Sequence, residues 1–145
     1  MQESYERIKT AYLLLDDGDH TFLKQYDLTL AQFYALSWLH ESPQNMTQLS
    51  SNMLCDPSNI TRVATILERK GLITRQRNKQ DRRVVELKLT PAGQQLYRKV
   101  AQAHAVYTQQ RMDTLTPAEQ EHLTTLLTRL IDGLRQELQN QTAGA

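Results

Sequence analysis

The apolar positions of this 145-residue chain recur mostly at the spacing of amphipathic α-helices, and capping residues mark where those helices begin. Thr29 opens a capping box, in which a threonine and a glutamine three residues later bond each other's backbone amides, and this box predicts a helix over residues 30–41. Thr47 is expected to cap a short helix that ends near Leu54.

A further helix is predicted directly after the short one. Asp56 supplies a capping carboxylate, and Pro57 has the backbone angle of a first helical position. The helix is expected to run to Lys70, because Gly71 is typical of a helix C-terminus. Helix, tight turn and helix therefore follow one another between residues 47 and 70, which is the arrangement of a helix-turn-helix unit.

The apolar period changes from helical to two residues after the helix-turn-helix unit. Residues 84–89 alternate in the manner of a half-buried strand, and residues 72–77 supply an antiparallel partner. The polar residues 78–83 are expected to form the tip of this hairpin.

Long helices are predicted at both ends of the chain. Thr90 followed by Pro91, and a capping box at Thr116, start the last two helices, and a first helix is expected to run into the low twenties past Gly18. The last and the first of these helices carry apolar stripes, formed by Leu123, Leu126, Leu127, Leu130, Ile131, Leu134 and Leu138 and by Tyr5, Ile8, Tyr12 and Leu15, respectively. Such stripes can pack within one subunit, but helical ends around a small central unit favour an interface with a second copy.

These elements predict a mainly α-helical protein with a small β-hairpin wing, organised as one domain over residues 1–145. Residues 28–90 are expected to form a winged helix-turn-helix lobe. Residues 3–26 and 91–139 are expected to form dimerisation helices, followed by a flexible tail over residues 140–145.

Charge is distributed unevenly along the chain, although its net value is only +1. Residues 62–88 carry nine Lys or Arg against three Asp or Glu, whereas residues 1–61 carry three against eight. A concentrated positive charge attracts polyanions such as nucleic acids. By charge alone, a solvated basic hairpin explains the pattern equally well.

The second helix of the helix-turn-helix unit has two chemically distinct faces. Its apolar face consists of Ile60, Val63, Ala64 and Leu67. The opposite face carries hydroxyl and guanidinium groups and almost no acid, which favours binding to phosphates and base edges over a generic solvated face. The predicted DNA-binding residues are Thr47, Ser58, Asn59, Thr61, Arg62, Thr65, Arg69, Arg77, Lys79, Asp81, Arg82 and Arg83.

A winged helix that serves only protein contacts is the alternative interpretation, because a fold does not determine a function. Protein-docking faces typically expose aromatic side chains, and residues 58–83 contain none. This composition favours DNA binding.

Three segments of the chain resemble the MarR family of bacterial transcriptional regulators. They are residues 67–75 (LERKGLITR), residues 81–83 (DRR) and residues 87–93 (LKLTPAG). The resemblance extends over about residues 5–138 in the order of its elements. It implies an obligate homodimer, held by the first and last helices, that places two recognition helices in successive major grooves of a pseudo-palindromic operator.

The resemblance also assigns roles within the wing. The family's pattern Asp-x-Arg falls on Asp81 and Arg83, which implies that the arginine enters a minor groove and that the aspartate restrains a neighbouring arginine. A physical reason supports the first role, because a narrow minor groove concentrates negative potential.

A small effector that relieves repression is a further implication of the resemblance, and lipophilic aromatic anions are its common type. Tyr12, Tyr34 and Trp38 are candidates for lining its cleft, with His20 or Arg7 facing a carboxylate. Each of these residues is equally consistent with ordinary core or surface.

No motif in the sequence predicts catalysis, a cofactor or a metal site. The run of acidic residues and histidine at 16–20 is contiguous and fits a solvated helix face, since metal ligands are spaced so that they converge. Cys55, the single cysteine, fits a small inert turn residue, although its oxidation would disturb nearby DNA contacts. The lack of a disulfide pair, a signal sequence and a long apolar stretch predicts a cytoplasmic protein.

Overall fold

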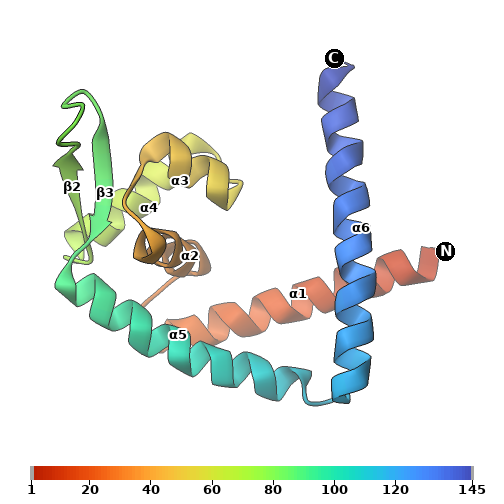
Figure 1. Ribbon diagram of the computed structural model, residues 1–145. Coiled ribbons are helices and arrows are strands. Elements are labelled where there is room, and N and C mark those ends of the chain that lie inside the picture. The colour runs from red at the N-terminus through yellow and green to blue at the C-terminus, as the bar shows by residue number, and fades with distance from the viewer. Residues whose placement is uncertain (1, 145) are drawn as a thin grey trace. The chain divides into compact units, whose positions relative to one another are not determined.

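The structure, a computed structural model, describes residues 2–144 and consists mainly of α-helices with one small antiparallel sheet (Figure 1). The elements in chain order are α1 (Gln2–Lys24), α2 (Leu30–Glu41), β1 (Gln44–Asn45), α3 (Met46–Met53), α4 (Pro57–Arg69), β2 (Ile73–Arg77), β3 (Val85–Leu89), α5 (Pro91–Met112) and α6 (Pro117–Ala143). The chain divides inside α5 into two compact units, Met1–His104 and Ala105–Ala145. The predicted boundary of the DNA-binding lobe, residue 90, lies directly before the start of this helix.

Most helix starts follow the predicted caps. Thr29 and Thr116 each form the expected capping box, and the Asp56 carboxylate accepts a hydrogen bond from a backbone amide in the first turn of α4. The prediction that Thr47 caps α3 is wrong. Asn45 caps this helix, because its side chain and that of Gln48 bond each other's backbone amides at 2.8 and 2.9 Å. Thr47 lacks a glutamine or glutamate three residues later and is the second residue of the helix.

The predicted hairpin is present and belongs to a three-stranded sheet of order β1-β3-β2. Ile73 pairs with Leu89 at the base of the hairpin, and Arg77 pairs with Val85 near its tip. The sequence pattern does not reveal β1, because this strand has only two residues and exists through its pairing with β3.

The core of the lobe is formed by α2, α3, α4 and the hairpin, which gather together in Figure 1. The predicted apolar face of α4 is confirmed, since all four of its residues are at most 6% exposed. Leu36, Leu49 and Leu87 pack into the same cluster and are fully or almost fully buried. Burial of this face orients the opposite face of α4 toward solvent.

The start of α5 packs closely against Gly71 and Leu72, the residues between α4 and β2. The Thr90 hydroxyl donates to the Gly71 carbonyl at 2.7 Å, and the Thr90 amide donates to the Leu72 carbonyl at 3.0 Å. A Cβ atom on Gly93 would lie 2.0 Å from the Leu72 carbonyl oxygen, so only glycine fits there. These contacts explain the spacing of the Leu-Thr-Pro-Ala-Gly segment and hold the base of the wing in place.

The first helix has the predicted length, because α1 continues through Gly18 without a break and ends at Lys24. The last helix extends further than predicted: α6 runs to Ala143, so residues 140–143, assigned to a flexible tail, are helical; residue 145 lies outside the described range. The predicted apolar stripes are largely exposed to solvent, with Tyr12 at 63% and Leu138 at 61%. Every helix among residues 2–144 is too short or too polar to cross a bilayer.

Candidate nucleic-acid interface

The exposed face of α4 begins with side chains that organise its first turn. The Ser58 hydroxyl and backbone amide donate to the Asp56 carboxylate at 2.7 and 2.9 Å, and these hydrogen bonds hold the pKa of that carboxyl below its ordinary value. The Thr61 hydroxyl donates to the Pro57 carbonyl at 3.0 Å. These hydroxyls therefore donate their hydrogen bonds within the protein, and their free lone pairs can accept hydrogen bonds from donors on DNA.

Arg62 is an available cation on this face. It is exposed, and among the residues that the structure describes its guanidinium has no ion-pair or hydrogen-bond partner. Its five N–H donors in a fixed fork match the two acceptors on the major-groove edge of guanine. Asn59 on the preceding turn is half-buried, and Arg69 is exposed in the last turn.

The wing tip is organised by Asn78, a residue that the sequence analysis did not select. Its side-chain oxygen accepts hydrogen bonds from the backbone amides of Gln80 and Asp81 at 2.7 and 3.1 Å, and its side-chain nitrogen donates to Glu86 at 2.6 Å. Asparagine favours this kind of turn because its side chain bonds the backbone two residues on. That preference is the signal that would have identified Asn78.

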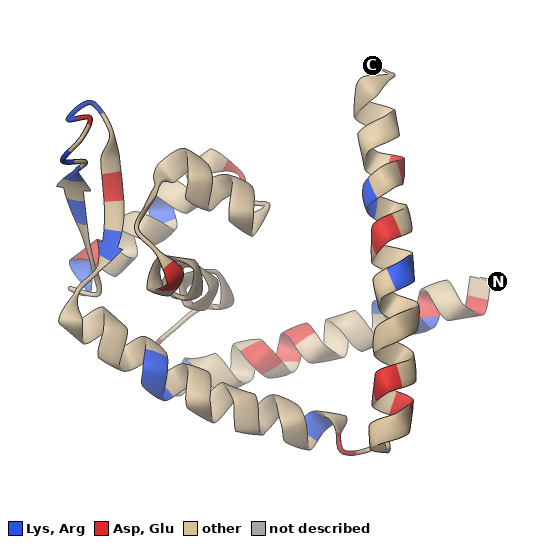
Figure 2. Ribbon diagram, in the orientation of Figure 1, with Lys and Arg blue, Asp and Glu red and all other residues tan. Residues whose placement is uncertain are grey.

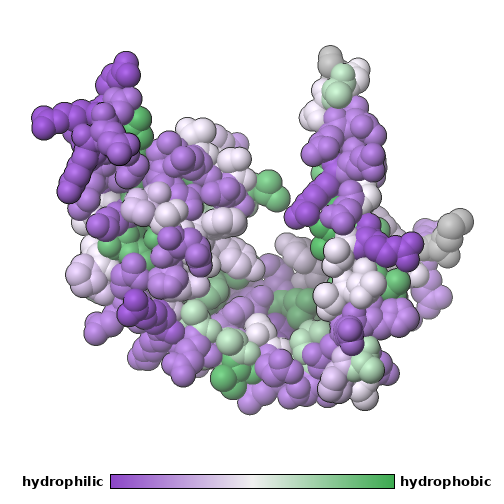
Figure 3. Space-filling view, viewed as in Figure 1, coloured by the Kyte–Doolittle hydropathy of each residue, from purple (hydrophilic) through white to green (hydrophobic). Residues whose placement is uncertain are grey.

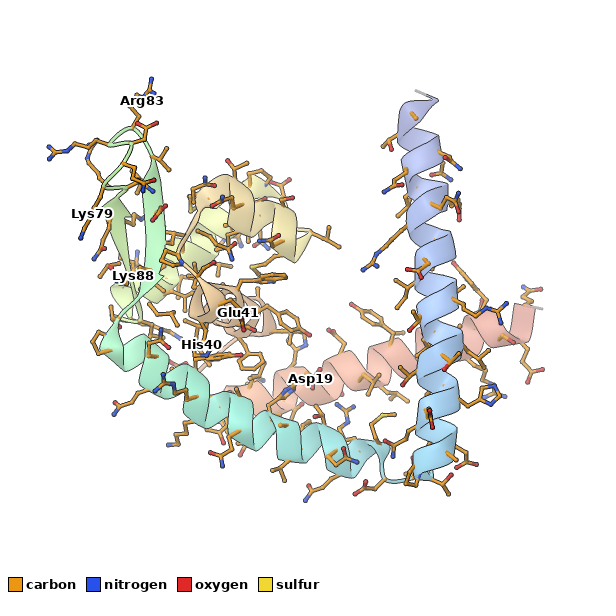
Figure 4. The ribbon with its side chains drawn as sticks, in the orientation of Figure 1. Asp19, His40, Glu41, Lys79, Arg83 and Lys88 are labelled. Atoms are coloured by element: carbon orange, nitrogen blue, oxygen red, sulfur yellow. The ribbon has the colours of Figure 1, made fainter. Side chains whose placement is uncertain are left out.

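Asp81 and Arg83 meet at the tip as the Asp-x-Arg pattern implies. The Asp81 carboxylate accepts hydrogen bonds from the Arg83 backbone amide and from its Nε, each at 3.1 Å. The Arg83 guanidinium and amide hold the pKa of the Asp81 carboxyl below its ordinary value. The Arg83 side chain remains 92% exposed and extends from the end of the hairpin (Figure 4).

Basic residues surround this pair and give the wing its positive charge (Figure 2). The Arg77 guanidinium donates to the Arg82 carbonyl at 2.9 Å, and Arg77, Lys79 and Arg82 border one hollow of about 280 Å³. The outer part of the wing is mainly hydrophilic (Figure 3), as a phosphate-binding surface requires. Thr47 of α3 lies apart from the wing and borders a different hollow of about 410 Å³ together with Thr61.

The recognition helix and the wing are joined by Arg75, which the sequence analysis also missed. Its Nη2 donates to the Thr65 hydroxyl at 3.3 Å, and its Nε lies 3.4 Å from a Glu68 carboxylate oxygen. Strand alternation places Arg75 on the same side as the buried Ile73, facing α4. The alternation was the available signal for this contact.

A third hollow, of about 490 Å³, lies beside α2 and is bordered by three of the predicted effector residues, His20, Tyr34 and Trp38. Partial burial and the negative charges of Asp19 and Asp16 raise the pKa of Tyr34. The remaining residues that border it are Leu30, Ala31, Asn52, Met53 and Cys55.

The other two effector candidates do not border this hollow. Tyr12 is 63% exposed on α1, and Arg7 forms an exposed ion pair with Glu3 at 3.6 Å. His20 does border the hollow, and its Nδ1 lies 2.8 Å from the Asp16 carbonyl oxygen. Among residues 2–144, no three His, Cys, Asp or Glu side chains converge as a metal site would require.

Comparison with known proteins identifies the family. The sequence profile of the MarR family matches residues 28–85. The chain is 31% identical over 105 residues to the HTH-type transcriptional regulator YkoM of Bacillus subtilis, an alignment that covers 72% of this chain and 68% of YkoM. Its structure is similar to that of AbsC, a MarR family transcriptional regulator from Streptomyces coelicolor, with a TM-score of 0.83, 25% identity and coverage of 92% and 93% of the two chains. It is also similar to Streptococcus pneumoniae FabT in complex with DNA, with a TM-score of 0.80, 24% identity and coverage of 93% and 97%. This chain therefore belongs to the MarR family of helix-turn-helix transcriptional regulators.

Proposed function

We propose that this DNA-binding regulator acts in the cytoplasm as a homodimeric repressor, without catalytic activity, and that a small aromatic effector releases it from its operator. The observation that carries the DNA-binding geometry is the exposed Arg83 at the wing tip, held by Asp81, beside a recognition helix whose outer face offers an unpaired Arg62. FabT, which shares the fold, was crystallised with DNA, and this supports the proposal.

In the proposed complex, α4 enters the major groove and the wing enters the flanking minor groove. Ser58, Asn59, Thr61 and Arg62 lie on the half of α4 that would approach the bases. The exposed cations of the wing would contact phosphates. This division of labour follows from side-chain chemistry, because base edges are read by directed donors and acceptors while phosphates attract any cation.

Selection of bound sequences from a random duplex library tests this function. We expect a pseudo-palindrome whose half-sites are centred about 10 base pairs apart or a multiple of that spacing. Affinity for the selected duplex should fall steeply with the logarithm of salt concentration, because the basic wings release condensed counterions. A salt-independent affinity, or a selection without enrichment, would contradict the proposal.

Dimerisation would bury the apolar stripes of the terminal helices. No side chain of α6 is buried among the described residues, and Leu126, Leu134 and Leu138 are each between 47% and 61% exposed. A monomer would have to keep this stripe in water, whereas a second copy removes it from solvent. Leu126→Asp combined with Leu134→Asp should therefore yield monomers by light scattering, while the control Thr128→Glu should remain dimeric. A double variant that stays dimeric would refute this interface.

The hollow beside α2 is the proposed effector site. Trp38 borders it and is the only tryptophan of the chain, so its fluorescence reports directly on occupancy. Benzoate is a suitable first probe for the aromatic anion that the family resemblance implies. Saturable quenching, lost in Tyr34→Ala and accompanied by weaker operator binding, would support the site. Quenching without any change in operator binding would separate ligand binding from regulation.

A further inference from the structure

Arg75 connects two elements that approach different grooves of DNA in the proposed complex. Its guanidinium reaches from β2 to two side chains of α4, the hydroxyl of Thr65 at 3.3 Å and the carboxylate of Glu68 at 3.4 Å. Thr65 and Glu68 are three residues apart and therefore lie on one face of the helix. One side chain thus holds a strand of the wing against the recognition helix.

This contact limits what Thr65 offers to DNA. The Thr65 hydroxyl donates its single proton to the Thr61 carbonyl at 2.8 Å and accepts a hydrogen bond from Arg75. A hydroxyl has one proton and two lone pairs, so only one lone pair of Thr65 is left. Glu68 is the only acidic residue of α4, and its pairing with Arg75 neutralises a charge that would repel phosphates.

Pairing with β1 and the contacts of the start of α5 hold the base of the wing, and Arg75 adds a direct polar link between the wing and α4. The connection between them passes through Gly71, whose φ of +73° marks a sharp change of direction, and beyond the residues paired with β1 the hairpin projects into solvent as two strands, which makes it compliant. Fixing the hairpin before binding removes part of the ordering cost that DNA contact would otherwise incur.

We propose that Arg75 is a positioning residue that couples the wing to the recognition helix, so that both grooves are contacted by one rigid unit, and that Thr65 anchors Arg75 instead of reading a base. This inference rests on the proposed geometry in which α4 and the wing bind DNA together. Sequence analysis placed Thr65 among the DNA-contacting residues, and the geometry points to a different role for it.

A double-mutant cycle on the selected operator tests the coupling. Arg75→Met keeps the aliphatic stem and removes the guanidinium, and Thr65→Val keeps the shape and removes the hydroxyl. Arg75→Met should weaken binding by about 10-fold, and Thr65→Val should weaken it less, because Glu68 still holds Arg75 in that variant. The double variant should bind no more weakly than Arg75→Met alone, because removing the guanidinium already loses the Thr65 contact. The penalty of Arg83→Ala should also shrink in the Arg75→Met background, since a released wing places Arg83 poorly.

Two further measurements distinguish the effect of the Arg75 charge from its role in positioning the wing. Arg75→Lys keeps the charge but its single ammonium cannot hold both partners, so it should bind as weakly as Arg75→Met. The salt slope should be unchanged in Arg75→Lys, because this variant keeps the charge beside Glu68 and a clamp neutralises no phosphate. The exposed Arg98 on α5 gives a matched control, and Arg98→Met should leave affinity and slope unaltered.

Several outcomes would overturn the inference. Additive losses in the cycle, rescue by Arg75→Lys, or a slope that falls by about 0.9 per site would make Arg75 an independent phosphate contact. A changed preference at one base pair in Thr65→Val would make Thr65 a reader. If urea unfolding shows that Arg75→Met is poorly folded, the cycle is repeated with Arg75→Lys, which carries the same expectation. If the wild-type protein selects no duplex, the proposed function fails; if it does and the cycle is additive, only this inference fails.

Discussion

Replacing Arg83 with alanine should reduce the salt dependence of DNA binding by an amount that the structure allows to be worked out. The side chain is 92% exposed and pairs with Asp81 of the same hairpin tip, so its loss disturbs no buried contact. If each Arg83 neutralises one phosphate, a dimer loses two, and the slope of log affinity against log salt becomes shallower by about 1.8.

The difference in operator affinity between wild type and Arg83→Ala should therefore depend on salt concentration. A slope change of about 1.8 over a fourfold rise in salt, from about 50 to about 200 mM, narrows the affinity gap between wild type and Arg83→Ala by about 10-fold. The loss should be largest on operators whose flanks are A·T pairs, because these narrow the minor groove and deepen its negative potential.

Fluorescence anisotropy with a labelled operator at four salt concentrations measures both effects. Operators with A·T flanks and with G·C flanks should be compared. Arg82→Ala removes the same charge from the adjacent position and is the matched control; it should lower the slope without altering the flank preference. If Arg83→Ala changes neither the slope nor the flank preference beyond what Arg82→Ala does, Arg83 does not enter the groove and the reasoning is refuted.

Three further predictions concern the helix, the base of the wing and the wing tip. Arg62→Ala should cost about 1–3 kcal/mol on the selected operator and flatten the preference at one base pair in each half-site; an unchanged preference on repeated selection would remove Arg62 from base reading. Gly93→Ala should lower the free energy of unfolding in urea by about 1–3 kcal/mol, because a Cβ atom 2.0 Å from the Leu72 carbonyl oxygen forces the backbone to move. This cost outweighs the gain in helix propensity of about 1 kcal/mol. A stabilised variant would show that α5 does not pack against Leu72. Carboxyl NMR titration should give Asp81 a pKa below its ordinary value, with the pKa raised toward that value in Arg83→Ala, in which only the backbone amide of residue 83 still bonds the carboxylate. Because that pKa is lowered, the stabilisation of the wing by this pair is fully present above the ordinary aspartate range and is lost as pH falls through the lowered value; an unshifted Asp81 would contradict the pairing.

The sequence by itself determined those parts of the protein that depend on near neighbours. The caps at Thr29, Asp56 and Thr116 bond amides two or three residues away, so their positions could be read without knowledge of the fold. The same is true of Asp81 and Arg83, which are two residues apart in one turn. Asn45 shows the limit of this approach, because two overlapping cap signals compete and the reciprocal bond with a glutamine decides between them.

Tertiary packing decided which distant side chains meet. Arg75 and Thr65 lie on different elements, and their contact depends on the rotation of α4 and the register of β2, which burial of the common core sets together. The strand β1 likewise exists only because β3 offers it a free edge. Of the residues chosen as effector ligands, packing brings His20 beside α2 and leaves Tyr12 exposed. Periodicity tells which face of an element is apolar, but the residue that a polar side chain reaches across the gap depends on angles and spacings that only the assembled core defines.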